Sequence, residues 1–266
     1  MESPVRKSLK ISPIWQKLKL IQNEVWISKN PEEMSMEIKH IQDHLMSVEE
    51  GYVRCFLIEG ETGALVIDGG VETGLRKFME KQTSQKLTFL LTHSDPDHTA
   101  ACGEFEEILL HPAEMARLAR KQKIQNRFAA IQEGDLLDFE PYHFEVVLIP
   151  GHTPGSIALW EKEKRFLISG DSVTNATTFL FGEGRSLPAY LCSLRKLAAI
   201  AGQLNVIYGS HGPVEVPPTR INELIALCER VERGEIHGVP AERFAGDIQE
   251  YRHQGAAIYY PALTQE

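Results

Sequence analysis

Apolar residues along this chain gather in short runs that are separated by turn-forming residues. Residues 52–58 (YVRCFLI) and 64–67 (ALVI) are two such runs, and the GETG segment between them predicts a hairpin turn. The run at residues 87–91 (LTFLL) is continuously apolar, which is typical of a strand that is covered on both faces. The pattern therefore predicts β-sheets that lie inside the protein.

Further runs and helical spacings extend this picture to the whole chain. Strands are predicted at residues 24–28, 107–110, 131–139, 144–149, 156–160, 165–168, 206–208 and 256–260. Helices are predicted at residues 74–83, 99–105, 112–123, 189–204 and 219–233. In the last helix we expect Thr219 as the N-cap and Gly234 at the end. Because strands and helices mix throughout, we expect one α/β domain in which helices cover sheets.

Two stretches do not fit a regular element. Residues 30–50 are polar and rich in methionine, and we interpret them as a loop or a helical insert. His40 and His44 in this stretch would share a helix face, and we interpret them as surface residues. Residues 172–187 are expected to be irregular.

The composition limits the partners of this protein. The chain has 266 residues and a formal net charge of −9, without the basic excess of a nucleic-acid binder. The basic segment 117–127 is interpreted as a solvated helix face. No apolar run approaches the roughly 20 residues that span a bilayer, and the N-terminus lacks a signal-peptide pattern. We expect a cytoplasmic protein with neither a nucleic-acid nor a membrane partner.

The four cysteines are scattered and form no CxxC pair, which predicts a reducing compartment and no disulfides. Cys55 and Cys192 are expected in the core. Cys102 follows His98 closely, so it is either a small buried filler or a neighbour of the site described next.

Four short blocks combine histidine and aspartate with turn-forming residues, and each follows a predicted strand. They are THSDPDH with His93, Asp95, Asp97 and His98, PGHTPGS with His152, SGDS with Asp171, and YGSHGP with His211. Imidazoles and carboxylates that converge from several segments suit a first-row divalent metal. In an extended loop, alternate residues of the first block project to one side. His98 joins them if the chain turns before a helix at residue 99.

These blocks resemble the signature of the metallo-β-lactamase-fold superfamily, with blocks like those of glyoxalase II. The resemblance also includes Asp68-Gly69-Gly70 and covers residues 24–235. It implies a four-layer αββα sandwich of two mixed sheets flanked by helices. Residues 1–23 would be an N-terminal extension, residues 24–235 the metallo-β-lactamase-like domain, and residues 236–266 a C-terminal segment that packs on the same domain.

The resemblance also implies a set of metal ligands for two divalent ions. The first ion would take His93, Asp95, His152 and Asp171, and the second would take Asp97, His98, Asp171 and His211. Asp171 would bridge the pair, and Asp68 would orient ligands through hydrogen bonds, unless it is only a turn residue.

Asp95 departs from the family, which usually has a histidine there. A carboxylate adds negative charge and hardens the site, so iron or manganese join zinc as candidate ions. Flavodiiron proteins carry a glutamate at this place, and the alternative function is therefore a di-iron redox or oxygen-binding protein. The chain leaves no room for their flavodoxin-like domain after the metal domain.

Residues and resemblance together predict a metal-dependent hydrolase. A hydroxide held between the two metal ions would attack an ester, thioester, lactone or phosphodiester bond of a small-molecule substrate. Asp97 is expected to accept a proton as well as to bind metal. Substrate residues are expected at Phe179, Phe181, Arg185 and Tyr190, with ordinary packing or surface exposure as the alternative. The oligomeric state is left open, with a homodimer as one option.

Overall fold

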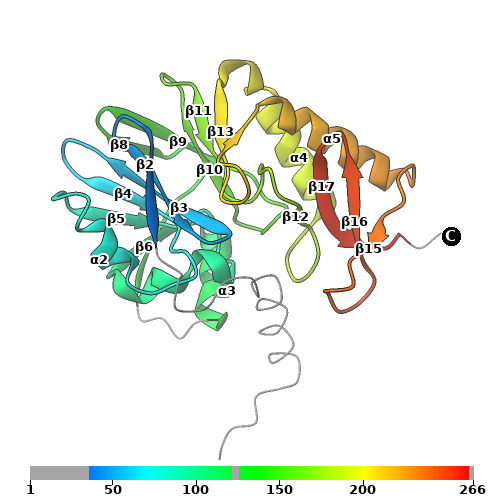
Figure 1. Cartoon of the computed structure of the whole chain (residues 1–266), viewed down its shortest axis with the longest axis horizontal. Helices are drawn as coiled ribbons and strands as arrows, with labels where there is room; N and C mark the ends of the chain where they lie inside the picture. Colours follow the sequence, from blue (N-terminus) through cyan, green and yellow to red (C-terminus); the bar gives the residue numbers. More distant parts are fainter. Residues whose placement is uncertain (1–35, 122–125, 264–266) are drawn as a thin grey trace, which may run out of the picture.

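The computed structural model describes residues 36–121 and 126–263. Within them, the chain builds three β-sheets of seven, six and four strands (Figure 1). The predicted strand at residues 24–28 and the predicted N-terminal extension lie outside the described residues. The division into residues 1–23, 24–235 and 236–266 stays a prediction.

The first sheet has the order β1-β2-β3-β4-β5-β6-β7. Its strands are β1 (Glu37–Gln42), β2 (Leu45–Glu50), β3 (Val53–Glu59), β4 (Ala64–Ile67), β5 (Leu87–Leu90), β6 (Glu107–Leu110) and β7 (Arg127–Ala130). Neighbours from β1 to β4 are antiparallel, and neighbours from β4 to β7 are parallel. The predicted hairpin is confirmed, since the backbone N–H of Gly60 donates to the carbonyl of Gly63 at 2.8 Å.

The second sheet has the order β14-β13-β11-β10-β9-β8. Its strands are β8 (Leu136–Phe139), β9 (Tyr142–Leu148), β10 (Ile157–Glu161), β11 (Phe166–Ile168), β13 (Val206–Tyr208) and β14 (Glu215–Val216). Only β11 and β13 run parallel, so this sheet is also mixed. Both sheets are thus mixed, as the family resemblance implies.

The two sheets pack face to face and carry helices on their outer faces. Side chains alternate along each strand. Phe56 therefore enters the core between the sheets, whereas its neighbour Leu57 enters the outer core beneath α2 (Leu75–Met79) and α3 (Pro112–Lys121). The other outer face lies under α4 (Leu187–Ala198) and α5 (Thr219–Glu232). The predicted αββα sandwich is confirmed.

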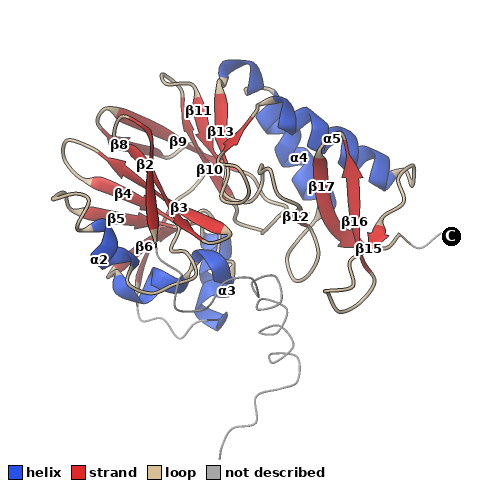
Figure 2. Cartoon of the chain, in the orientation of Figure 1, coloured by secondary structure: helices blue, strands red, loops and turns tan. Residues whose placement is uncertain are grey.

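Of the third sheet, the sequence predicted only the strand at residues 256–260. Its order is β12-β17-β16-β15, with β12 (Thr178–Phe179), β17 (Ala256–Pro261), β16 (Ile248–His253) and β15 (Val239–Pro240). Tyr251 and Ile258 of this sheet share a core with residues of α5. Figure 2 shows this sheet beside α4 and α5, at the end of the molecule away from α2.

Several local predictions were wrong. The described part of residues 30–50 forms the hairpin β1–β2, with exposed His44 at the turn in a left-handed conformation (φ 62°). The polar residues that suggested a loop lie mostly on the edge strand β1, while Leu45 and Val48 of β2 are fully buried. Because the polar residues lie on an edge strand, the pattern of polar and apolar positions did not predict the hairpin.

Other differences concern element ends and single residues. Residues 172–187 contain the short strand β12, and the helix predicted at residues 99–105 is 3₁₀ over Ala100–Glu104. Pro218, not Thr219, occupies the N-cap of α5. Cys192 is exposed because it lies on the outer side of α4, whereas Cys55 is buried as expected. Among the described residues, no helix is both long and apolar enough to cross a bilayer.

Candidate metal centre

Four loops at the ends of strands carry the predicted ligand residues. His93 lies just beyond β5, His152 beyond β9, Asp171 beyond β11 and His211 beyond β13. The first block turns as expected, since Pro96–His98 is a 3₁₀ turn in which the N–H of His98 donates to the carbonyl of Asp95 at 3.0 Å. Rigid sheets therefore hold the loops that bring these side chains together.

One group of donor atoms surrounds a first position. Nε2 of His93 lies 3.2 Å from Nε2 of His152 and 3.8 Å from Oδ2 of Asp171. Oδ2 of Asp95 lies 3.2 Å from Nε2 of His152 and 3.8 Å from Nε2 of His93. Donors that each lie about 2.1 Å from one ion in a tetrahedron are about 3.4 Å apart, which these distances match.

A second group lies on the other side of Asp171. Nε2 of His98 is 3.2 Å from Oδ1 of Asp171, and Nε2 of His211 is 3.1 Å from Oδ2 of Asp171. Oδ2 of Asp97 is 3.5 Å from Nε2 of His211. Oδ2 of Asp171 also lies 3.5 Å from Nε2 of His152 in the first group. The carboxylate of Asp171 therefore borders both groups of donor atoms.

The outer nitrogen of each histidine is held by a hydrogen bond. Nδ1 of His152 lies 2.9 Å from the carbonyl of Phe179, and Nδ1 of His211 lies 2.9 Å from the carbonyl of Tyr52. Because a carbonyl only accepts, both Nδ1 atoms carry the proton in the neutral ring. Their Nε2 lone pairs therefore point into the site.

Asp68 fixes the other two histidines in the same way. Its Oδ2 lies 2.9 Å from Nδ1 of His98, and its carboxylate also accepts from the hydroxyl of Thr92. Since that hydroxyl hydrogen is used, Oγ1 of Thr92 accepts from Nδ1 of His93 at 3.0 Å. All four Nε2 atoms consequently offer lone pairs to one space.

Unpaired polar atoms mark the same space. Among the described residues, Nε2 of His98 and Oδ1 of Asp171 are buried and make no hydrogen bond. A buried polar atom without a partner is costly, and a cation between these donors removes that cost. The donor set of imidazoles and carboxylates therefore fits a divalent first-row metal.

The pKa values show how strongly these groups interact. Burial lowers the pKa of His93 well below its usual value, so this ring stays neutral. Burial raises the pKa of Asp171, but His211 and His98 outweigh it and hold the pKa well below its usual value. Burial raises the pKa of Asp97 above its usual value. Asp97 also has the most exposed side chain of the three candidate carboxylates, at 19% against 8% for Asp95 and 9% for Asp171.

Two arginines bind Asp95, and sequence reasoning missed this contact. Nη2 of Arg117, on α3, donates to Oδ1 of Asp95 at 2.7 Å. Nη2 of Arg185 donates to Oδ2 of the same carboxylate. Burial raises the pKa of Asp95, but Arg185 outweighs it and holds the pKa well below its usual value. Two guanidinium charges therefore offset the negative charge that Asp95 adds, while its carboxylate oxygens remain hard donors.

Two buried charged residues connect the loops of the site. Glu114 accepts from the N–H of Ser94 at 3.0 Å and from the N–H of Gly155 at 2.8 Å. Position 155 requires glycine, because a Cβ there would lie 2.7 Å from Cγ of Glu114. Arg54 donates to the carbonyls of Gly209 and Gly212, on either side of His211. Neither residue stands in a recognisable sequence block, so no local pattern pointed to them.

The predicted substrate residues separate into three environments. Phe179 and Phe181 lie in an aromatic cluster with Phe244 and Tyr259, whose ring centroids lie 4.8–5.7 Å apart in the contacting pairs. Arg185 binds Asp95, as described above. Tyr190 is fully buried and its hydroxyl donates to the carbonyl of Ser172, which favours the alternative of ordinary packing for this residue. The helix pattern around Tyr190 is the signal for core packing.

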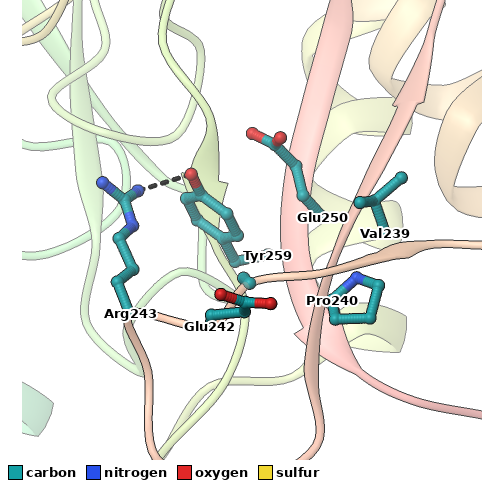
Figure 3. A pocket seen from close by; sticks show the side chains of 7 residues that line it. Val239, Pro240, Glu242, Arg243, Glu250 and Tyr259 are labelled. Atoms are coloured by element: carbon teal, nitrogen blue, oxygen red, sulfur yellow. Dashed lines mark hydrogen bonds between the residues drawn. The ribbon is translucent and has the colours of Figure 1, made fainter.

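A hollow of about 420 Å³ lies on the third sheet. It is lined by Val239, Pro240, Ala241, Glu242, Arg243, Glu250 and Tyr259. Figure 3 shows the guanidinium of Arg243 beside the hydroxyl of Tyr259, to which it donates. None of the candidate metal-binding residues lines this hollow. Tyr259 belongs to the aromatic cluster, and the guanidinium of Arg243 lies 4.8 Å from the ring centroid of Phe244 in the same cluster.

The fold and the histidine–aspartate cluster agree with the comparison to known families. The model of the metallo-beta-lactamase superfamily matches residues 48–211, more than half of the chain. The chain therefore belongs to the metallo-beta-lactamase superfamily.

Individual relatives match a shorter part. The chain is 28% identical over 163 residues to the hydroxyacylglutathione hydrolase of Bdellovibrio bacteriovorus, which covers 61% of this chain and 64% of that protein. It is 31% identical over 166 residues to the hydroxyacylglutathione hydrolase of Nitrosomonas eutropha, covering 59% of each. The match thus spans less than two thirds of these relatives. A metallo-beta-lactamase from Pontibacter korlensis has the same fold, with a TM-score of 0.64, 15% identity, and coverage of 73% of this chain and 99% of that structure.

Proposed function

We propose that this protein is a metal-dependent hydrolase whose centre holds two divalent cations. The first cation would be bound by His93, Asp95, His152 and Asp171, and the second by Asp97, His98, Asp171 and His211. The observation that carries this proposal is the convergence of four Nε2 lone pairs and three carboxylates in one buried space. Zinc is our first choice of ion, because it accepts both imidazole and carboxylate ligands in a four-coordinate site.

The substrate bond is proposed to be a thioester or a related ester, lactone or phosphodiester. The relatives named above are hydroxyacylglutathione hydrolases, which supports an acylated thiol as the first choice. When bound, the cations supply Lewis-acid polarisation and water that is acidic near neutral pH. Asp97, whose pKa is raised by burial, is placed to take up a proton at its Oδ2.

The chain's own residues orient these groups. Asp68 and the carbonyls of Phe179 and Tyr52 keep the imidazoles pointing inward. The aromatic cluster around Phe179 is proposed to form an apolar wall for the substrate. The di-iron redox alternative, which depended on a carboxylate at position 95, is not favoured, because the similar relatives named above are hydroxyacylglutathione hydrolases.

The test combines metal analysis with a substrate panel. We expect protein purified without added metal to contain zinc and to hydrolyse at least one thioester, lactone or phosphodiester. His93→Ala should lose both metal and turnover, whereas His237→Ala should keep both, because His237 is an exposed histidine outside the groups of possible metal ligands among the described residues. Full turnover after complete removal of metal would refute the proposal.

A further inference from the structure

The two metal positions differ in their charged surroundings. At the first position, Oδ2 of Asp95 is 3.2 Å from Nε2 of His152, where a cation would bind it, and the same oxygen accepts from Arg185. The other oxygen of Asp95 is held by Arg117. A cation and Arg185 would therefore compete for one oxygen atom.

The second position lacks such competition. Among the residues that the structure describes, no arginine or lysine pairs with Asp97 or Asp171, whose ion pairs are all with histidines. In addition, Asp68 lies behind His98 at 2.9 Å and contributes another buried negative charge. Two guanidinium groups thus act at the first position and an extra carboxylate acts at the second.

Both arginines are held close to the site. The side chains of Arg117 and Arg185 are 9% and 12% exposed, so water screens their charges only weakly. Arginine keeps its proton at any working pH, so the competition does not disappear on titration. A dication that enters the first position must approach two fixed positive charges.

From these contacts we infer that the two positions fill unequally, with the second position binding its cation first and more tightly, and that Arg185 is the residue that weakens the first position. This inference rests on the proposed two-cation centre. It assigns to Arg185 a role in lowering the metal affinity of the first position, in place of the direct substrate contact that the sequence suggested.

The experiment is a zinc titration of metal-free full-length protein in a calorimeter. Mass spectrometry counts the bound zinc ions. We expect two steps whose dissociation constants differ by about tenfold or more. Arg185→Gln should tighten the weak step by about tenfold, whereas Arg185→Lys, which keeps the charge, should not. The thermal melting of each variant checks that it is folded.

The chain offers a matched control and a way to assign the steps. Arg120 lies on α3 like Arg117 and pairs with exposed Glu183, so Arg120→Gln removes a nearby charge without touching Asp95. It should leave both steps unchanged. His152→Ala should remove the weak step and His211→Ala the tight step.

The outcomes separate this inference from the proposed function. Two equal tight steps in the unaltered protein, or a weak step that Arg185→Gln leaves unchanged, would overturn the inference while the two-cation centre stands. Loss of the tight step in His152→Ala would overturn it as well. Absence of zinc binding would overturn both.

Discussion

Nδ1 of His98 lies 2.9 Å from Oδ2 of Asp68, and neither side chain has any exposed surface. Asp68 also accepts from the backbone N–H of Thr92 at 2.8 Å and from the Thr92 hydroxyl, which in turn accepts from His93. One buried carboxylate therefore fixes two of the four candidate ligand imidazoles.

Replacing Asp68 with asparagine should weaken zinc binding. The amide NH₂ would face the Nδ1–H of His98, and relief of that clash moves the ring proton to Nε2, where the metal must bind. We expect a loss of about 10- to 100-fold in zinc affinity, which calorimetry measures. Asp247→Asn is the control and should bind zinc normally, because Asp247 is exposed and outside the groups of possible metal ligands among the described residues. Unchanged affinity in Asp68→Asn would show that the hydrogen bond to His98 does not set the tautomer.

Zinc binding should release protons at neutral pH. Burial lowers the pKa of His98, but Asp171 and Asp68 outweigh it and raise the pKa well above its usual value. The pKa of His211 is raised because Asp171 and Asp97 outweigh burial in the same way. These rings therefore hold protons that zinc must displace, and affinity should rise as the pH rises through the raised pKa values.

Calorimetry in buffers with different ionisation enthalpies measures this proton release. The apparent binding enthalpy should depend on the buffer in the unaltered protein and in His237→Ala alike. An enthalpy that is the same in every buffer would contradict the prediction.

Arg54 should stabilise the loop that carries His211. It makes two bonds to Glu49 and two to the carbonyls of Gly209 and Gly212. Lysine keeps the positive charge, but its ammonium group cannot make the four hydrogen bonds that the planar guanidinium donates. Arg54→Lys should lower the free energy of unfolding by about 1–3 kcal/mol in urea denaturation and weaken the binding of zinc at His211. The exposed Arg195, which pairs with Glu229, provides the control substitution Arg195→Lys, and equal stability of the two variants would argue against this role.

Phe244 should affect substrate binding more than turnover. Its ring lies 5.4 Å from that of Phe179 and 4.8 Å from that of Phe181, measured between centroids. Phe244→Ala removes part of the proposed apolar wall without touching a candidate ligand. For the best thioester of the panel we expect KM to rise by about tenfold while kcat changes less than about twofold. Phe78→Ala, on the distant helix α2, should leave KM unchanged. A change in kcat alone would place the cluster outside the substrate site.

The sequence predicted the candidate ligands because they lie in local blocks. His93, His152, Asp171 and His211 follow apolar runs whose strand character is readable from a few residues. The sandwich could be predicted for the same reason, together with the family resemblance. The contacts that connect the blocks could not be predicted, because they join residues far apart in the chain.

Arg117 and Arg185 illustrate this limit. Each is an ordinary arginine in its own segment, one in a basic helix and one in an irregular loop, and only the folded chain brings both to Asp95. For Tyr190 the sequence left substrate contact and ordinary packing open, and its burial on α4 favours packing. The hairpin β1–β2 was missed because an edge strand can be polar and still pair fully.

His152 is held by the main-chain carbonyl of Phe179, the last residue of β12, and not by its side chain. Any residue at position 179 supplies that carbonyl. Mutations there would therefore change the shape and polarity of the proposed apolar wall while the histidine keeps its orientation. In evolutionary terms, this would uncouple substrate diversification from the upkeep of the proposed metal site, and it makes position 179 a suitable starting point for altering specificity by directed evolution.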